Sequence, residues 1–186
     1  SRGVRHLSAG QVTQSVRHGT FARVHLRAHT RHPRWYLSHE LVHALMGPSW
    51  RPLPGVLTEG LCDALAARVA PEVAPVVRAH RALHASLYFG EMTYRLGYVD
   101  PATDESRLAL VSYSYASDDT SPDPDALLGQ GRWDFHTRGA VPATFYGLGF
   151  LVVERMIDRI GVEGIHGLCL RATAEGREVV PVEWIL

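Results

Sequence analysis

The sequence predicts an α+β fold, in which a small N-terminal part that carries a strand lies over a helix and precedes a mostly helical C-terminal part. Apolar and polar residues alternate over 20–30, which is typical of a half-exposed strand. Helical patterns bounded by Pro and Gly begin near residue 35. The 186 residues contain no repeat or linker, so we expect a single domain with parts of about 1–47 and 48–186.

The expected elements of the first half follow from these patterns. A helix is expected over 35–46, because a Gly-Pro pair follows it and commonly ends helices. A Pro-rich loop over 47–55 leads to a second helix, which Thr58 is expected to cap and Pro71 to end. A third helical stretch covers about 72–90.

The second half begins with a long loop. Over 97–139 the periodicity fades into segments rich in Asp, Ser and Pro, apart from a short strand-like piece at 108–116. A loop of this length can form a lid or the wall of a cleft. The alternative, which we prefer here, is an ordinary surface loop. One helix is then expected over 141–161, a short one over 162–173 and an extended C-terminus.

Composition argues against several function classes. The formal net charge is zero, so the chain lacks the basic field expected of a protein that binds nucleic acid or an anionic membrane. No uninterrupted apolar run is long enough to span a bilayer. Cys62 and Cys169 either form one disulfide or, as the commoner outcome, remain buried thiols. The compartment therefore stays open, with a secreted or cell-envelope location slightly favoured.

The strongest chemical motif is HELVH at 39–43, on the expected helix over 35–46. Positions i and i+4 share a helix face, so His39 and His43 can bind one metal ion together. Glu40 lies one step round the helix, where its carboxylate can take a proton from a metal-bound water that attacks a carbonyl. The competing interpretation is chance, because a chain with 11 His will occasionally contain this pattern.

A second pair, His80 and His84, has the same spacing but lacks a glutamate after the first His. We interpret this pair as a solvated helix face, with a second metal site as the minor alternative. The pair therefore provides an internal comparison for the motif at 39–43.

The motif needs a third ligand, because a catalytic zinc site commonly has three protein ligands and one open position. The longer motif HExxHxxGxxH is excluded, because Gly47 comes one position late and Trp50, three residues after that Gly, is not a His. Glu59 is the candidate ligand, with 15 residues between it and His43. Asp63 shares its helix face and can hold the other nitrogen of a ligating His. The alternatives are a Glu favoured by the helix dipole and a solvated Asp.

Over 36–68 the sequence resembles the gluzincins, the thermolysin-like and aminopeptidase-like branch of the HExxH metallopeptidases. The segments that carry the resemblance are SHELVHALMG and LPGVLTEGLCDALA, and their connection is slightly shorter than is usual in that group. The resemblance implies a zincin-like fold, a peptide or protein substrate, and one zinc ion per chain held by His39, His43 and Glu59. It also implies that Asp63 supports a zinc-binding histidine.

A weaker resemblance lies downstream, where ATFYGLGFLVVERMIDRIG at 143–161 is similar to the helix that follows the zinc ligands in that group. It implies that Tyr146 donates a hydrogen bond to the oxyanion formed during hydrolysis. His136 is the competing donor, in the role that thermolysin-like enzymes give to a histidine. For either residue a plain structural role is at least as good an interpretation.

The expected function is therefore zinc-dependent hydrolysis of peptide bonds, with a metal-bound water activated by Glu40. One alternative is a non-catalytic zincin-like domain that binds a partner or stabilises a larger protein. Another is an HExxH hydrolase that acts on a non-peptide bond. Glu40 favours an enzyme, because a degenerate domain has no need of a general base. The sequence indicates neither the cleavage specificity nor the oligomeric state.

Overall fold

Helices dominate the protein in a computed structural model, which describes the backbone of residues 10–15, 21–26, 32–86, 92–99, 106–113, 128–129 and 143–185. Side chains are described within 32–86, 128–129 and 144–185. The helices are α1 (Pro33–Leu45), α2 (Gly55–Val69), α3 (Ala74–Ser86) and α6 (Ala143–Ala174), with short 3-10 turns η1 (Pro48–Trp50) and η2 (Val182–Trp184). The strands are β1 (Gly10–Ser15), β2 (Phe21–Leu26), β3 (Met92–Val99) and β4 (Ser106–Tyr113).

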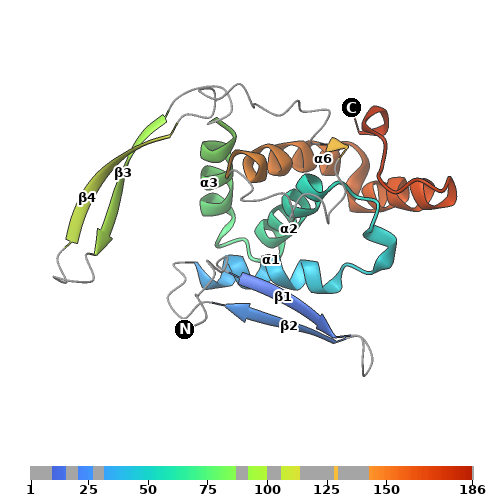
Figure 1. Cartoon of the computed structure of the whole chain (residues 1–186), viewed down its shortest axis with the longest axis horizontal. Coiled ribbons are helices and arrows are strands. Elements are labelled where there is room, and N and C mark those ends of the chain that lie inside the picture. The colour runs from blue at the N-terminus through green and yellow to red at the C-terminus, as the bar shows by residue number, and fades with distance from the viewer. Residues whose placement is uncertain are drawn as a thin grey trace, which may run out of the picture.

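The helices pack around α2, and the strands form two separate hairpins (Figure 1). α6 crosses both α2 and α3, while α1 lies against α2. β1 pairs antiparallel with β2, and this hairpin contacts the side of α1 that faces away from α2. β3 pairs antiparallel with β4 in a ribbon that extends away from the helices in Figure 1. The described core is therefore a helical assembly.

One apolar cluster fills the space between the helices. Its largest fully buried side chains include Trp35 from α1, Leu57 and Leu61 from α2, and Phe150 from α6. The cluster continues along the second half of α6 and reaches the C-terminal segment, where the amide of Val180 donates to the carbonyl of Pro52 at 2.8 Å. Burial of this apolar surface is the main favourable term for such a fold.

The predicted α+β class, with a strand-bearing part over the active-site helix, is wrong. The part of the chain with described side chains is almost entirely helical and contains no strand. The strands at 10–26 and 92–113 form two-stranded hairpins rather than a layer of the fold. The alternation of apolar and polar residues over 20–30 corresponds to β2, one strand of a hairpin. A period of two residues indicates an extended strand and nothing more. It does not establish that a sheet builds the core.

The helix boundaries differ in part from the sequence-based expectation. α2 begins at Gly55, and the Thr58 hydroxyl donates to the carbonyl of Pro54 at 3.1 Å instead of capping the helix. The predicted break after 161 is present, because Gly161 interrupts α6 with φ 70° and ψ 175°. Positive φ is a conformation that glycine adopts without the cost other residues incur. The C-terminus forms η2 and not the extended segment expected for it.

The long loop predicted over 97–139 is only partly described. β3 ends inside it, and β4 overlaps the strand-like piece expected at 108–116. The first of these two strands was not predicted. The rest of the loop, apart from 128–129, lies outside the described residues. In the described part of the chain, no helix combines the length and apolar character needed to cross a membrane.

α2 and α6 approach each other so closely that only glycine fits at the crossing. A Cβ placed on Gly60 of α2 would overlap the backbone of Gly149 on α6. A Cβ on Gly149 would in turn overlap the carbonyl of Val56. This close crossing holds the first turns of α6 against α2, and Tyr146 lies near enough to Glu59 for that carboxylate to raise its pKa.

Candidate metal centre

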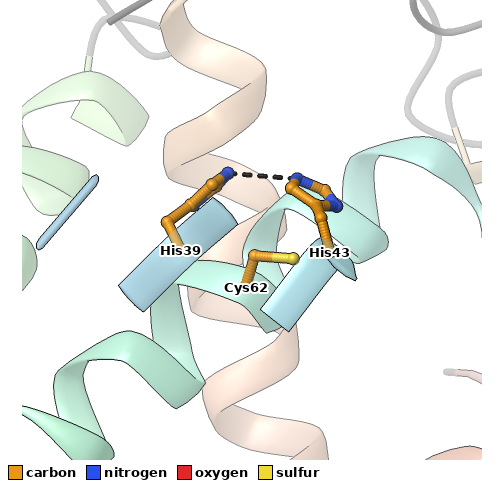
Figure 2. A group of neighbouring side chains, drawn as sticks. All are labelled: His39, His43 and Cys62. Carbon is orange, nitrogen blue, oxygen red and sulfur yellow. Dashed lines mark hydrogen bonds between the residues drawn. The ribbon is translucent and has the colours of Figure 1, made fainter. Parts of the chain in front are cut away.

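Two buried histidines on α1 face each other. Trp35, His39 and His43 follow at intervals of four residues and form the buried stripe of this helix. Trp35 is 1% exposed and anchors the start of the helix in the core. His39 Nε2 and His43 Nε2 lie 3.1 Å apart, and Figure 2 shows both imidazoles pointing toward one another. Two ring nitrogens at this distance can both contact a single bound ion.

Glu59 on α2 completes a triangle with these nitrogens. One carboxylate oxygen lies 3.2 Å from His39 Nε2, and the other lies 3.2 Å from His43 Nε2. Its side chain is almost fully buried. Two ligand atoms placed 2.0–2.1 Å from a tetrahedral zinc ion would lie about 3.3–3.4 Å apart. The three side chains therefore converge with the separations that such an ion requires.

Cys62, also on α2, lies beside the same two histidines. Its thiol and one ring nitrogen of each histidine lie within 4.8 Å of one another, and Figure 2 shows the sulfur next to the imidazole pair. The buried group of His39, His43 and Cys62 could therefore hold a metal ion. Cys62 and Cys169 are both buried thiols, which confirms the commoner of the two outcomes expected for them.

Two overlapping ligand sets thus share His39 and His43 and differ in the residue from α2. Glu59 already stands at 3.2 Å from each ring nitrogen, whereas the Cys62 group is defined only by a 4.8 Å limit. A zinc–sulfur bond of about 2.3 Å needs the thiol to stand about 3.5 Å from each nitrogen. We favour the Glu59 set, because the observed separations fit it directly.

Asp63 holds His39 from behind. His39 Nδ1 donates to Oδ1 of Asp63 at 2.9 Å, and the indole N–H of Trp35 donates to the same oxygen at 2.7 Å. Arg81 Nε donates to Oδ2 at 2.6 Å. The expected hydrogen bond between Asp63 and a candidate ligand is therefore present. When His39 is neutral, this contact keeps its proton on Nδ1, and Nε2 then has a lone pair available for a metal.

The carboxylates dominate the electrostatics here. Burial by itself would lower the pKa of His39, but Asp63 and Glu59 outweigh it and raise that pKa to about 10. Burial would likewise raise the pKa of Asp63, but His39 and Arg81 lower it to about 2. The site therefore strongly favours a positive charge at the position between its acidic side chains.

Two further predicted residues lie near this triangle. Glu40 is 8% exposed, on the helix that carries both histidines. Tyr146 of α6 is partly buried, and its pKa is raised first by burial and then by Glu59, with smaller contributions from Asp63 and Glu40. The phenol is thus within electrostatic reach of the site. His136, the competing donor, lies outside the described residues.

The solvated helix face predicted for His80 and His84 is wrong. The ring of His80 packs edge-on against Trp35 with centroids 5.2 Å apart, and the two imidazoles lie 4.1 Å apart. Arg81 Nη1 donates a hydrogen bond to His84 Nδ1 at 3.1 Å. Burial lowers the pKa of both histidines, that of His84 to about 4. This pair therefore packs against Trp35 and Arg81, and burial favours the neutral form of both rings.

Sequence reasoning missed three residues of the centre. Trp35 could have been found, because it precedes His39 by one helical turn on the same face. Cys62 stands one turn after Glu59, but it is expected from the sequence only as a disulfide partner or a buried thiol and not as a metal ligand. Arg81 carries no local signal, because its contact with Asp63 depends on how α3 packs against α2.

Comparison of the chain with known protein families, curated proteins and solved structures found no match. The resemblance over 36–68 thus remains a resemblance of motifs. The distances between the side chains of α1 and α2 carry the functional argument.

Proposed function

We propose that this chain binds one zinc ion through His39, His43 and Glu59 and hydrolyses peptide bonds with a water molecule activated by Glu40. The observation that carries the proposal is the convergence of three side chains: the two ring nitrogens lie 3.1 Å apart, and each lies 3.2 Å from one of the two carboxylate oxygens of Glu59. Imidazole and carboxylate are ligands that zinc commonly takes in catalytic sites. Three protein ligands leave a fourth position for water or substrate.

The surroundings of the triangle fit this donor set. Asp63 fixes the tautomer and orientation of His39, as outer carboxylates do for zinc-bound histidines. α1 supplies both histidines together with Glu40, and α2 supplies Glu59 with Asp63 one turn later. Two packed helices thus fix the separation of the candidate ligands.

The proposed chemistry gives each side chain a role. A bound zinc ion supplies a water of lowered pKa and polarises the carbonyl of the substrate. Glu40 accepts the proton of the attacking water and passes it to the leaving amine. Tyr146 donates a hydrogen bond to the carbonyl oxygen as negative charge develops there. Its raised pKa keeps the phenol protonated at neutral pH.

A structural metal site is the second candidate, and Cys62 is the observation that favours it. Structural zinc sites are closed by four protein ligands and often include cysteine. If the thiol moved in to join His39, His43 and Glu59, no position would remain for water. The protein would then be a binding or structural domain and not an enzyme.

Two measurements test the proposal. Elemental analysis of the purified chain should give one zinc per chain, and X-ray absorption at the zinc edge should show nitrogen and oxygen neighbours only. A sulfur neighbour at about 2.3 Å would support the structural site instead. A peptide library should be cleaved by the wild type, and cleavage should stop when a chelator removes the metal.

Glu40→Gln separates metal binding from catalysis. This variant should keep the zinc and the fold but lose hydrolysis, because a base is removed and no ligand is. Full activity of Glu40→Gln would refute the proposed mechanism, and absence of any bound metal in the wild type would refute the site.

A further inference from the structure

A buried arginine stands behind the proposed site, and the proposed mechanism gives it no role. Arg81 lies on α3, with its side chain 8% exposed, and its Nε is 2.6 Å from Oδ2 of the fully buried Asp63. A buried carboxylate is costly unless it is paired and fully hydrogen-bonded. The guanidinium therefore makes a charged Asp63 tolerable at this position in the core.

The same guanidinium also contacts aromatic rings from two other helices. Its central carbon lies 5.0 Å from the ring centroid of Trp35 and 5.2 Å from that of Tyr146. Both distances are within the range of cation–π attraction. Its Nη1 also donates to His84 Nδ1. Arg81 thus connects α3 to α1, α2 and α6 at one point.

We propose that Arg81 is a positioning residue of the metal centre that acts on His39 through Asp63, and this inference rests on the proposed function. Asp63 Oδ1 accepts from His39 and Trp35, while Oδ2 accepts from Arg81. With the arginine on Oδ2, the carboxylate is held in the plane that directs Oδ1 at the imidazole. Without it, Asp63 loses both its neutralising charge and its orientation, and His39 is less well held for a metal.

Arginine suits this role better than lysine would. Its planar group presents several N–H donors in fixed directions and stacks on aromatic rings, whereas an ammonium is a compact point charge. Lysine at this position would keep the positive charge near Asp63 but lose the fixed donor geometry and the ring contacts. Comparison of arginine with lysine at position 81 therefore separates the effect of the positive charge from the effect of the donor geometry.

The test is the affinity of the full-length chain for zinc, measured by competition with a chromophoric chelator. Arg81→Met should weaken zinc binding by roughly 10- to 100-fold, as changes behind a ligating histidine commonly do. Arg81→Lys should recover part of this loss. The matched control is Arg78→Met on the same helix, whose side chain is 55% exposed and pairs with Glu154. This control should leave the affinity unchanged.

Two further readouts distinguish positioning from general stabilisation. The visible spectrum of the cobalt-loaded protein should change in Arg81→Met, because the ligand field senses the orientation of His39, and should stay unchanged in Arg78→Met. In an Asp63→Asn background, Arg81→Met should cost much less affinity than in the wild type, because the arginine acts through that carboxylate. Additive losses would overturn the inference.

Unchanged zinc affinity in folded Arg81→Met, even with lowered thermal stability, would also overturn it. If Arg81→Met does not fold, Arg81→Lys decides by the same criterion: a reduced affinity supports positioning and an unchanged one refutes it. If the wild type and the Arg81 variants bind zinc equally well, only the inference about Arg81 is refuted. A wild type that binds no metal refutes the proposed function as well.

Discussion

Two histidine pairs with identical spacing have become different sites in this molecule. His39 and His43 form the α1 pair, and His80 and His84 form the α3 pair. In the α1 pair both rings are turned toward a common point beside α2. In the α3 pair the rings pack on each other and on an aromatic neighbour. Helical spacing alone therefore does not make a ligand pair.

The neighbours explain the difference. The α1 pair faces two carboxylates, Glu59 and Asp63, and its first member, His39, has a pKa raised to about 10. The α3 pair flanks Arg81, and the pKa of its second member, His84, is lowered to about 4 by burial and by nearby positive charge. Acidic neighbours attract a cation, and a basic neighbour repels one. The charge of the neighbouring side chains thus distinguishes the two pairs.

The largest effect should come from removing one histidine of each pair. His43→Ala deletes a proposed ligand and should abolish binding of zinc, whereas His84→Ala should leave one zinc per chain. Elemental analysis after dialysis against excess zinc measures both. Metal retained in His43→Ala and lost in His84→Ala would reverse the comparison between the pairs.

The next test concerns what the α1 pair faces on α2. Glu59→Ala should lose zinc, and Cys62→Ala, one helical turn away, should keep it, because the proposal places the carboxylate on the metal and the thiol outside it. Isothermal titration with zinc gives both affinities. The opposite pattern would make Cys62 the third ligand and would favour the structural site.

A smaller effect is expected at Tyr146, which lies against Arg81 beside the α1 pair. Tyr146→Phe should leave zinc binding intact and lower kcat by about 100-fold with little change in KM, because a donor to the developing oxyanion is lost. Steady-state kinetics on a cleaved library peptide measure this split. A kcat equal to that of the wild type would remove Tyr146 from the mechanism, and His136 would become the candidate to test.

The smallest effect should be a pH dependence of stability at the α3 pair. His84 has a folded pKa of about 4, while an unfolded histidine titrates near 6.5, so the unfolded state binds more protons between these values. Stability should therefore fall as pH drops through this window. His84→Gln should reduce that dependence, as measured by the urea midpoint at pH 7 and pH 5. Equal midpoint shifts in the two proteins would contradict a neutral buried His84.

Local sequence signals predicted the parts of the site that lie on single helices. Both histidines and Glu40 follow from one five-residue motif, and Asp63 follows from its position one turn after Glu59. Arg81 was not predicted, because α3 must pack against α2 before its side chain reaches Asp63. The burial of the α3 pair was missed for the same reason, because the contact between His80 and Trp35 forms only when α3 packs against α1.

Fold class was harder to predict than the helices themselves. The helix boundaries near 35, 46 and 161 follow from Pro and Gly, which act locally on backbone geometry. Whether a strand joins a core sheet or remains in a two-stranded hairpin depends on distant partners. Alternation at 20–30 carries no information about such partners, and the α+β prediction failed for that reason.

The proposed ligands are neighbours in the chain, whereas some of the side chains around them come from distant segments. His39, His43 and Glu59 lie on two consecutive helices, while Arg81 and Tyr146 come from later segments. Closing a short loop costs less chain entropy than closing a long one, so α1 and α2 can meet early during folding. The proposed ligand set therefore needs only α1 and α2 to be in contact, whereas Arg81 and Tyr146 reach it when α3 and α6 pack against α2.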